Sequence, residues 1–244
     1  MDEYKDNIND GDIFIANDPH VAGGTHLPDI NMAMPVFNKG TLLGFVANIV
    51  HHADVGGAAA GSMSGGLNEI YKEGLRIPLV RLYNKGKIVK DIQRLLLLNM
   101  RLPDERKGDL NAQISACRLG VKRIQELLSK HGASYLNTAF EEILKRSKLR
   151  MQKAISKLPD GNYTFTDYMD DDGLNTKNIK ISVDIKKKGK KILFDFSKTD
   201  GQVDGNFNLT FNATQSSVCY SLKALLDPEL PNNRLLRDQG VFKV

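Results

Sequence analysis

The sequence predicts an α+β protein, because stretches with different periodicity follow one another along its 244 residues. Residues 1–90 hold short β-like runs separated by long glycine-rich connections. Residues 91–159 hold apolar residues at helical spacing, and residues 160–244 return to alternation before a last helical stretch. We therefore expect a β-rich, loop-decorated N-terminal part, an antiparallel helix pair, and an antiparallel sheet with a closing helix, together in one continuous domain.

The first part contains four β-like runs rich in apolar and β-branched residues. They cover residues 13–16, 30–37, 42–50 and 77–83. Glycine-rich segments between the runs are typical of long, irregular loops on a sheet.

The middle part predicts two helices. The first begins near Pro103 and ends at His131, and its apolar residues recur every three or four positions before Gly132. The second covers residues 134–158 and is stopped by a Pro-Asp-Gly turn at residues 159–161. At the end of the first helix, His131 is better explained as a favourable partner of the helix dipole than as a site residue.

The last part predicts three strands and a helix. Residues 163–167, 179–185 and 192–196 alternate in polarity, and residues 213–226 have helical spacing before Pro228. The lysine-rich residues 186–191 lie between two of these strands, so we interpret them as a solvated hairpin turn. No clear element is predicted after Pro231.

The composition excludes several classes of function. The net charge of +5 has local sources in two lysine-rich stretches without interleaved aromatic residues, which argues against a nucleic-acid module. No apolar run approaches the roughly 20 residues of a membrane span. The polar N-terminus does not resemble a signal peptide, and Cys117 and Cys219 stand in apolar surroundings. We therefore expect a cytoplasmic protein without membrane or nucleic-acid partners.

Four of the five histidines lie between His20 and His52, among aspartates, glycines and prolines. Imidazoles and carboxylates concentrated on loops are typical of a metal site. His26 and Asp29 flank a turn that contains Pro28, and His51 ends an apolar run, so we predict that these three residues bind zinc, manganese or iron. The alternative is a set of loop residues that hydrogen-bond to one another and to exposed backbone.

Other polar residues of this region have predicted supporting roles. On an extended strand His52 points away from His51, and Asp54 shares the side of His52, so either could be a general base or support the metal ligands. Asp18 is a further candidate for a carboxylate that orients an imidazole, and His20 is the weakest candidate of all.

Residues 56–66 consist almost entirely of glycine, alanine and serine. Such a segment allows backbone to approach a ligand closely, could bind an anion through its N–H groups, or could act as a flexible lid. It lacks the Gly-Lys-Ser/Thr of a phosphate-binding loop, so we assign no nucleotide site to this chain.

Several ordered motifs carry a resemblance to a known family. They are Asn17-Asp18-Pro19-His20, Gly23-Gly24-Thr25-His26-Leu27-Pro28-Asp29, His51-His52-Ala53-Asp54-Val55-Gly56-Gly57, Gly61-Ser62-Met63, Glu73-Gly74-Leu75-Arg76-Ile77-Pro78, Asp204-Gly205-Asn206 and Leu225-Leu226-Asp227-Pro228. Together they resemble the hydantoinase B / 5-oxoprolinase family, which includes the α subunit of acetone carboxylase. Since members normally extend beyond both ends of this segment, the chain resembles a central fragment or a split-gene member.

The resemblance implies an ATP-dependent enzyme of two subunits. ATP is held by a hydantoinase A type subunit, which phosphorylates the substrate, and the B-type chain completes hydrolysis of the activated cyclic amide. In the carboxylase branch, the positions of His26, Asp29 and His51 would hold manganese or zinc. The first hypothesis is therefore a subunit of a cyclic-amide hydrolase in a hetero-oligomer, and the alternatives are a carboxylase subunit or a non-catalytic assembly subunit.

Overall fold

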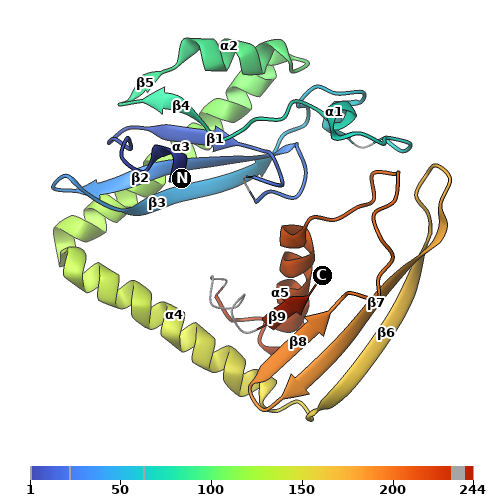
Figure 1. The fold of residues 1–244 in the computed structure, drawn as a ribbon. Helices are drawn as coiled ribbons and strands as arrows, with labels where there is room; N and C mark the ends of the chain where they lie inside the picture. The colour runs from blue at the N-terminus through green and yellow to red at the C-terminus, as the bar shows by residue number, and fades with distance from the viewer. Residues whose placement is uncertain (1, 22, 63, 232–239, 244) are drawn as a thin grey trace. The chain divides into compact units, whose positions relative to one another are not determined.

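A computed structural model of the chain describes residues 2–21, 23–62, 64–231 and 240–243. It contains two compact units, Met1–Leu136 and Asn137–Val244, each with its own β-sheet (Figure 1). Runs of strands and runs of helices follow one another along the chain, which confirms the predicted α+β class. Among the described residues, no helix is long and apolar enough to cross a membrane.

The first unit is built on a five-stranded antiparallel sheet with the strand order β3-β2-β1-β4-β5. The strands are β1 (Ile13–Ala16), β2 (Asp29–Asn38), β3 (Thr41–His51), β4 (Val80–Asn84) and β5 (Lys87–Ile88). The first three agree with the predicted runs. The fourth begins three residues later than expected, because the Ile77 N–H donates to the side chain of Asn17 instead of to a neighbouring strand.

Helices and short turns complete this unit. They are η1 (Asp2–Tyr4), η2 (Ala60–Ser62), α1 (Ile70–Glu73), α2 (Lys90–Leu98) and α3 (Pro103–His131). The predicted first helix of the middle part corresponds to α3, whereas α2 was not predicted as a separate element. Proline at the first position and acidic residues in the first turn explain why α3 begins at Pro103.

The core of the first unit lies between the sheet and α3. Leu110, Ile114 and Cys117 of α3 pack with Ile30 and other apolar residues of the sheet. Residues of α2, including Leu96, belong to the same cluster. Cys117 is fully buried, as its apolar surroundings indicated, and Cys219 in the second unit is half-buried.

The two long helices predicted for the middle part are α3 and α4 (Ala133–Ile155), and they contribute to the cores of different units. Only Gly132 separates α3 from α4, whereas an antiparallel helix pair needs a loop of about two to five residues. The apolar face of α3 is occupied by the first sheet, and Met151 and Ile155 of α4 belong to the core of the second unit. Each helix therefore packs on a sheet.

The second unit is built on a four-stranded sheet with the order β6-β7-β8-β9. Its elements are β6 (Gly161–Asp171), β7 (Lys177–Lys188), β8 (Lys191–Asp195), α5 (Phe211–Leu226) and β9 (Gly240–Lys243). The three predicted strands are antiparallel, as expected, but β9 adds to β8 in parallel, so the sheet is mixed. The closing helix is α5, capped by the Thr210 side chain, which accepts a hydrogen bond from the Ala213 N–H.

The lysine-rich hairpin between β7 and β8 is only partly solvated. Lys187 is 4% exposed, and its Nζ lies 2.6 Å from an Asp160 carboxylate oxygen.

The second unit also contains an apolar cavity of about 1050 Å³, lined by residues of the sheet and of α5 that include Ile181, Phe194 and Leu222.

Asp172 fastens the loop after β6 to the Asp204-Gly205-Asn206 motif. Its buried carboxylate accepts hydrogen bonds from the N–H groups of Leu174, Thr176 and Gly205 at 2.9, 3.0 and 3.2 Å. Burial alone would raise the pKa of Asp172, but these hydrogen bonds outweigh it and lower the pKa below its usual value.

Replacing Gly205 with alanine tests this packing. An added Cβ would overlap the carbonyl oxygen of Asp172, and overpacking of this kind usually costs about 1–3 kcal/mol. We expect Gly205→Ala to lower the free energy of unfolding by that amount in urea denaturation followed by circular dichroism. Gly201→Ala is the matched control, since its Cβ would meet no atom within 4 Å. Equal stability of the two variants would contradict the packing described.

Candidate metal centre

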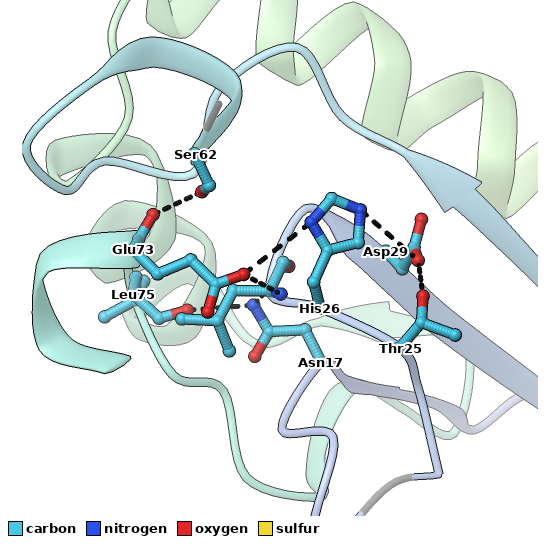
Figure 2. A network of polar contacts seen from close by, with 8 residues as sticks. Asn17, Thr25, His26, Asp29, Ser62, Glu73 and Leu75 are labelled. Carbon is cyan, nitrogen blue, oxygen red and sulfur yellow. Dashed lines mark hydrogen bonds and ion pairs between the residues drawn. The ribbon is translucent and has the colours of Figure 1, made fainter. Parts of the chain in front are cut away.

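Asn17, the residue after β1, connects three segments of the first unit. Its side-chain N–H donates to the carbonyl oxygens of Leu27 and Leu75, both at 2.8 Å, and its side-chain oxygen accepts from the Ile77 N–H at 2.6 Å. Asn17 is fully buried, so these hydrogen bonds are protected from water. They hold the loop that carries His26 against the segment that follows α1 (Figure 2).

The pairing of β2 with β3 places Asp29 directly opposite His51. Side chains of directly opposed residues share one face of an antiparallel sheet, with Cβ atoms about 4.5–5.5 Å apart. A turn precedes β2, in which the Asp29 N–H donates to the carbonyl oxygen of His26 at 3.1 Å. This turn brings the His26 side chain back toward the first residue of the strand.

The structure brings together the three predicted ligands His26, Asp29 and His51. One potential ligand atom of each lies within 4.8 Å of the others. The His26 Nε2 is 3.5 Å from an Asp29 carboxylate oxygen, and the ring centroids of His26 and His51 are 5.0 Å apart. The Thr25 hydroxyl donates a hydrogen bond to the same carboxylate oxygen.

This donor set fits a divalent cation. Two imidazoles and one carboxylate are a ligand set of zinc, manganese and iron, and three protein ligands leave further positions for water or substrate. His51 is exposed, and His26 and Asp29 are partly exposed, so the site opens to solvent. A small molecule or a partner chain can therefore reach it.

Glu73, the last residue of α1, is a member of the site that we did not predict. Its Oε1 lies 3.6 Å from the His26 Nδ1 and accepts a hydrogen bond from the Leu27 N–H at 3.3 Å. Figure 2 shows Glu73 and Asp29 on opposite sides of the His26 ring. The one signal in the sequence was its place at the head of the Glu73-Gly74-Leu75-Arg76 motif.

The glycine-rich segment packs against the backbone around Glu73. The Ala58 N–H donates to the Lys72 carbonyl oxygen at 2.7 Å, and the Ser62 hydroxyl donates to the Glu73 carbonyl oxygen. A Cβ added at Gly57, whose φ is +79°, would lie 2.6 Å from that same Glu73 oxygen. The glycine-rich segment therefore makes a close backbone contact with its own chain at Lys72 and Glu73.

His52, the residue after the predicted ligand His51, is buried inside the protein. It is 1% exposed, and its Nε2 is 3.1 Å from the side-chain oxygen of Gln113 on α3. The Gln113 side chain in turn donates to the Ile30 carbonyl oxygen at 2.7 Å. Burial lowers the pKa of His52, and the hydrogen bond with Gln113 opposes that shift only in part, which favours the neutral imidazole.

Asp54 is also buried and binds Arg101. Its carboxylate accepts hydrogen bonds from the Arg101 backbone N–H at 2.5 Å and guanidinium at 2.6 Å, and from the Gly56 N–H at 3.2 Å. Burial alone would raise the pKa of Asp54, but these hydrogen bonds outweigh it and the pKa is lowered. Asp54 thus connects the start of the glycine-rich segment to the residues before α3.

Asp18 contacts Arg76 and a turn of backbone. Its Oδ2 accepts from the Arg76 guanidinium at 2.6 and 2.9 Å, and its Oδ1 accepts from the His20 N–H at 2.9 Å. Burial would raise its pKa, but the hydrogen bonds and the Arg76 charge outweigh burial and lower it. The exposed His20 side chain belongs to this turn, and His131 ends α3 with its ring against Tyr135.

The family is decided by a comparison of the whole sequence. The profile described as Hydantoinase B/oxoprolinase matches residues 1–243. The chain belongs to the hydantoinase B/oxoprolinase family. Membership confirms the resemblance that the ordered motifs indicated, from Asn17 through Asp227-Pro228.

Curated relatives of this family member share about a third of its residues. An uncharacterized protein of Methanocaldococcus jannaschii is 39% identical over 97% of the chain and 40% of its own length. A Pseudomonas protein, named as the B component of a D-/L-hydantoinase, is 35% identical over 93% of the chain and 39% of its own length. The chain therefore spans about two fifths of the length of these relatives.

Solved structures give the same family fold. The ATP-dependent caprolactamase of Pseudomonas jessenii superposes with a TM-score of 0.90 at 30% identity, over the whole of this chain and 42% of that one. Nucleotide-free acetone carboxylase superposes with a TM-score of 0.88 over 98% of this chain and 33% of that one. At 20% identity, the second match shows the fold alone.

Asp54→Asn tests the buried contact with Arg101. A hydrogen bond to a charged group contributes about 1.5–3 kcal/mol, and the half-exposed Arg101 guanidinium favours the lower part of that range. We expect the metal-free variant to lose about 2 kcal/mol of unfolding free energy at pH 7, measured by urea denaturation with a chelator present.

The loss should depend on pH. Because the pKa of Asp54 is lowered in the folded state, its contribution is present above the unfolded pKa of about 3.9 and disappears as the pH falls through the folded value. The two stability curves should therefore converge below about pH 4. The exposed Asp10, changed to asparagine, is the control, and a pH-independent difference between wild type and Asp54→Asn would contradict the argument.

Proposed function

We propose that this chain is the metal-binding part of a B-type subunit in an ATP-dependent cyclic-amide hydrolase. The observation that carries the proposal is the convergence of His26, Asp29 and His51 in a member of the hydantoinase B/oxoprolinase family. The names of relatives support the reaction class, since they include the B component of a hydantoinase, 5-oxoprolinases and the beta chain of a caprolactamase. The proposed partner is a hydantoinase A type subunit that binds ATP.

The residues of the proposed site have different roles. His26, Asp29 and His51 hold a zinc, manganese or iron ion, which supplies Lewis-acid polarisation of a carbonyl or phosphoryl oxygen when bound. The Thr25 hydroxyl, hydrogen-bonded to the Asp29 carboxylate, limits the rotation of that side chain. The exposure of His51 leaves one side of the site open for the substrate.

We further propose that His52 and Asp54 support the site instead of transferring protons. His52 is 1% exposed and bound to Gln113, and both Asp54 oxygens are bound to Arg101, so neither group faces solvent where a substrate would lie. His52 fixes the end of β3 to α3 through Gln113, and Asp54 fixes the segment that follows. Both roles keep His51 in place.

The carboxylase branch is the second candidate. The delta subunit of acetophenone carboxylase from Aromatoleum aromaticum is 30% identical over 85% of the chain and 31% of its own length. The same metal site would serve both reactions, so the substrates must separate them. In complex with an A-type partner, ADP release that depends on a cyclic amide supports the hydrolase, and release that depends on bicarbonate and a ketone supports the carboxylase.

Metal content tests the proposal directly. We expect the wild-type chain, purified without an affinity tag, to hold close to one equivalent of zinc, manganese or iron by mass spectrometry. Because each removes one of three ligands, His26→Ala and His51→Ala should both lose the ion with unchanged circular dichroism. His20→Ala is the control and should keep it, since His20 lies in the turn held by Asp18. A wild type that binds none of these ions after incubation would contradict the proposed site.

A further inference from the structure

The two ring nitrogens of His26 face two different carboxylates. Nε2 lies 3.5 Å from Asp29, and Nδ1 lies 3.6 Å from Glu73, on opposite sides of the ring (Figure 2). An imidazole binds a metal ion through one nitrogen, and the N–H of the other nitrogen commonly donates to a carboxylate. The arrangement around His26 therefore offers one nitrogen to an ion and one to an acceptor.

The position of His51 decides which nitrogen serves which purpose. Asp29 is opposite His51 in the sheet, so an ion shared by these two residues lies on the Asp29 side of the His26 ring. That side presents Nε2. Nδ1 then remains for the N–H, and the group that it faces is Glu73.

Glu73 is held in place by both its backbone and its side chain. Ser62, Gly57 and the hydrogen bond from Ala58 to Lys72 fix the backbone. The Leu27 N–H donates to the same carboxylate oxygen that faces His26. The side chain is 24% exposed, so protein atoms cover most of it.

We infer that Glu73 is a positioning residue, whose carboxylate accepts the Nδ1–H of His26 and so directs Nε2 toward the metal ion. This inference rests on the proposed metal site. It also gives the glycine-rich segment of residues 56–62 a purpose, because Gly57 allows the close backbone contact that holds Glu73. A side chain at that position would push the Glu73 carbonyl oxygen away.

Metal affinity of Glu73 variants tests the inference. Loss of an outer-shell partner of a metal-bound histidine typically weakens metal binding 10–100-fold. Titration of the metal-free chain with Mn²⁺ or Zn²⁺ should therefore give a Kd roughly 10–100-fold higher for Glu73→Ala. Glu73→Gln should retain most of the affinity, because its amide oxygen can still accept from the His26 Nδ1–H and the Leu27 N–H.

Glu69→Gln is the matched control. It removes the same charge at an exposed position, four residues before Glu73 in the sequence. It should bind the ions as the wild type does, and the metal-free proteins should melt at similar temperatures. Equal Kd values for wild type and Glu73→Ala would overturn the inference. It would also be overturned if Glu73→Gln bound the ions as weakly as Glu73→Ala. The same holds if metal-free Glu73→Ala melted at a lower temperature, because its weaker metal binding would then reflect a less stable fold. If the wild type binds neither ion, it is the proposed metal site that fails.

Discussion

The register between β2 and β3 is the constraint on which the candidate site depends. It places Asp29, the first residue of β2, opposite His51, the last residue of β3. Because side chains alternate between the faces of a sheet, a shift of one residue would offer Ile30 to His51 and move the carboxylate to the other face. Burial of Ile30 and Met32 in the core opposes such a shift. The same apolar contacts that stabilise the sheet therefore also align two of the proposed ligands.

The loops around the site are held by contacts with one another. Asn17 connects the loop of His26 to the segment after α1, and the glycine-rich segment contacts the last residues of α1, Lys72 and Glu73. Asp54 joins the glycine-rich segment to Arg101, and Asp18 joins the first loop to Arg76. These buried or half-buried hydrogen bonds give loops, which have no regular structure of their own, the fixed geometry that metal ligands need.

Local patterns predicted the elements well, and tertiary contacts explain what they did not predict. Runs of apolar and β-branched residues located β1, β2 and β3, and the proline at residue 103 located α3. The density of histidines and aspartates indicated His26, Asp29 and His51. Periodicity identified the apolar face of α3 but could not show that a sheet, instead of α4, covers it. Glu73 stands 47 residues after His26, and their proximity depends on the contacts of Asn17 and Gly57, which no local pattern encodes. For the same reason the burial of Lys187 and the parallel addition of β9 could not be predicted.

Anomalous diffraction from crystals of the metal-loaded chain tests the central claim most directly. Data collected at the absorption edge of zinc or manganese locate the ion without any assumption about its ligands. The account predicts one strong peak about 2.0–2.2 Å from an Asp29 carboxylate oxygen and from a ring nitrogen of each of His26 and His51, with Nε2 the nitrogen used by His26. A peak bound by other side chains, or bound to the His26 Nδ1 on the side of Glu73, would contradict it.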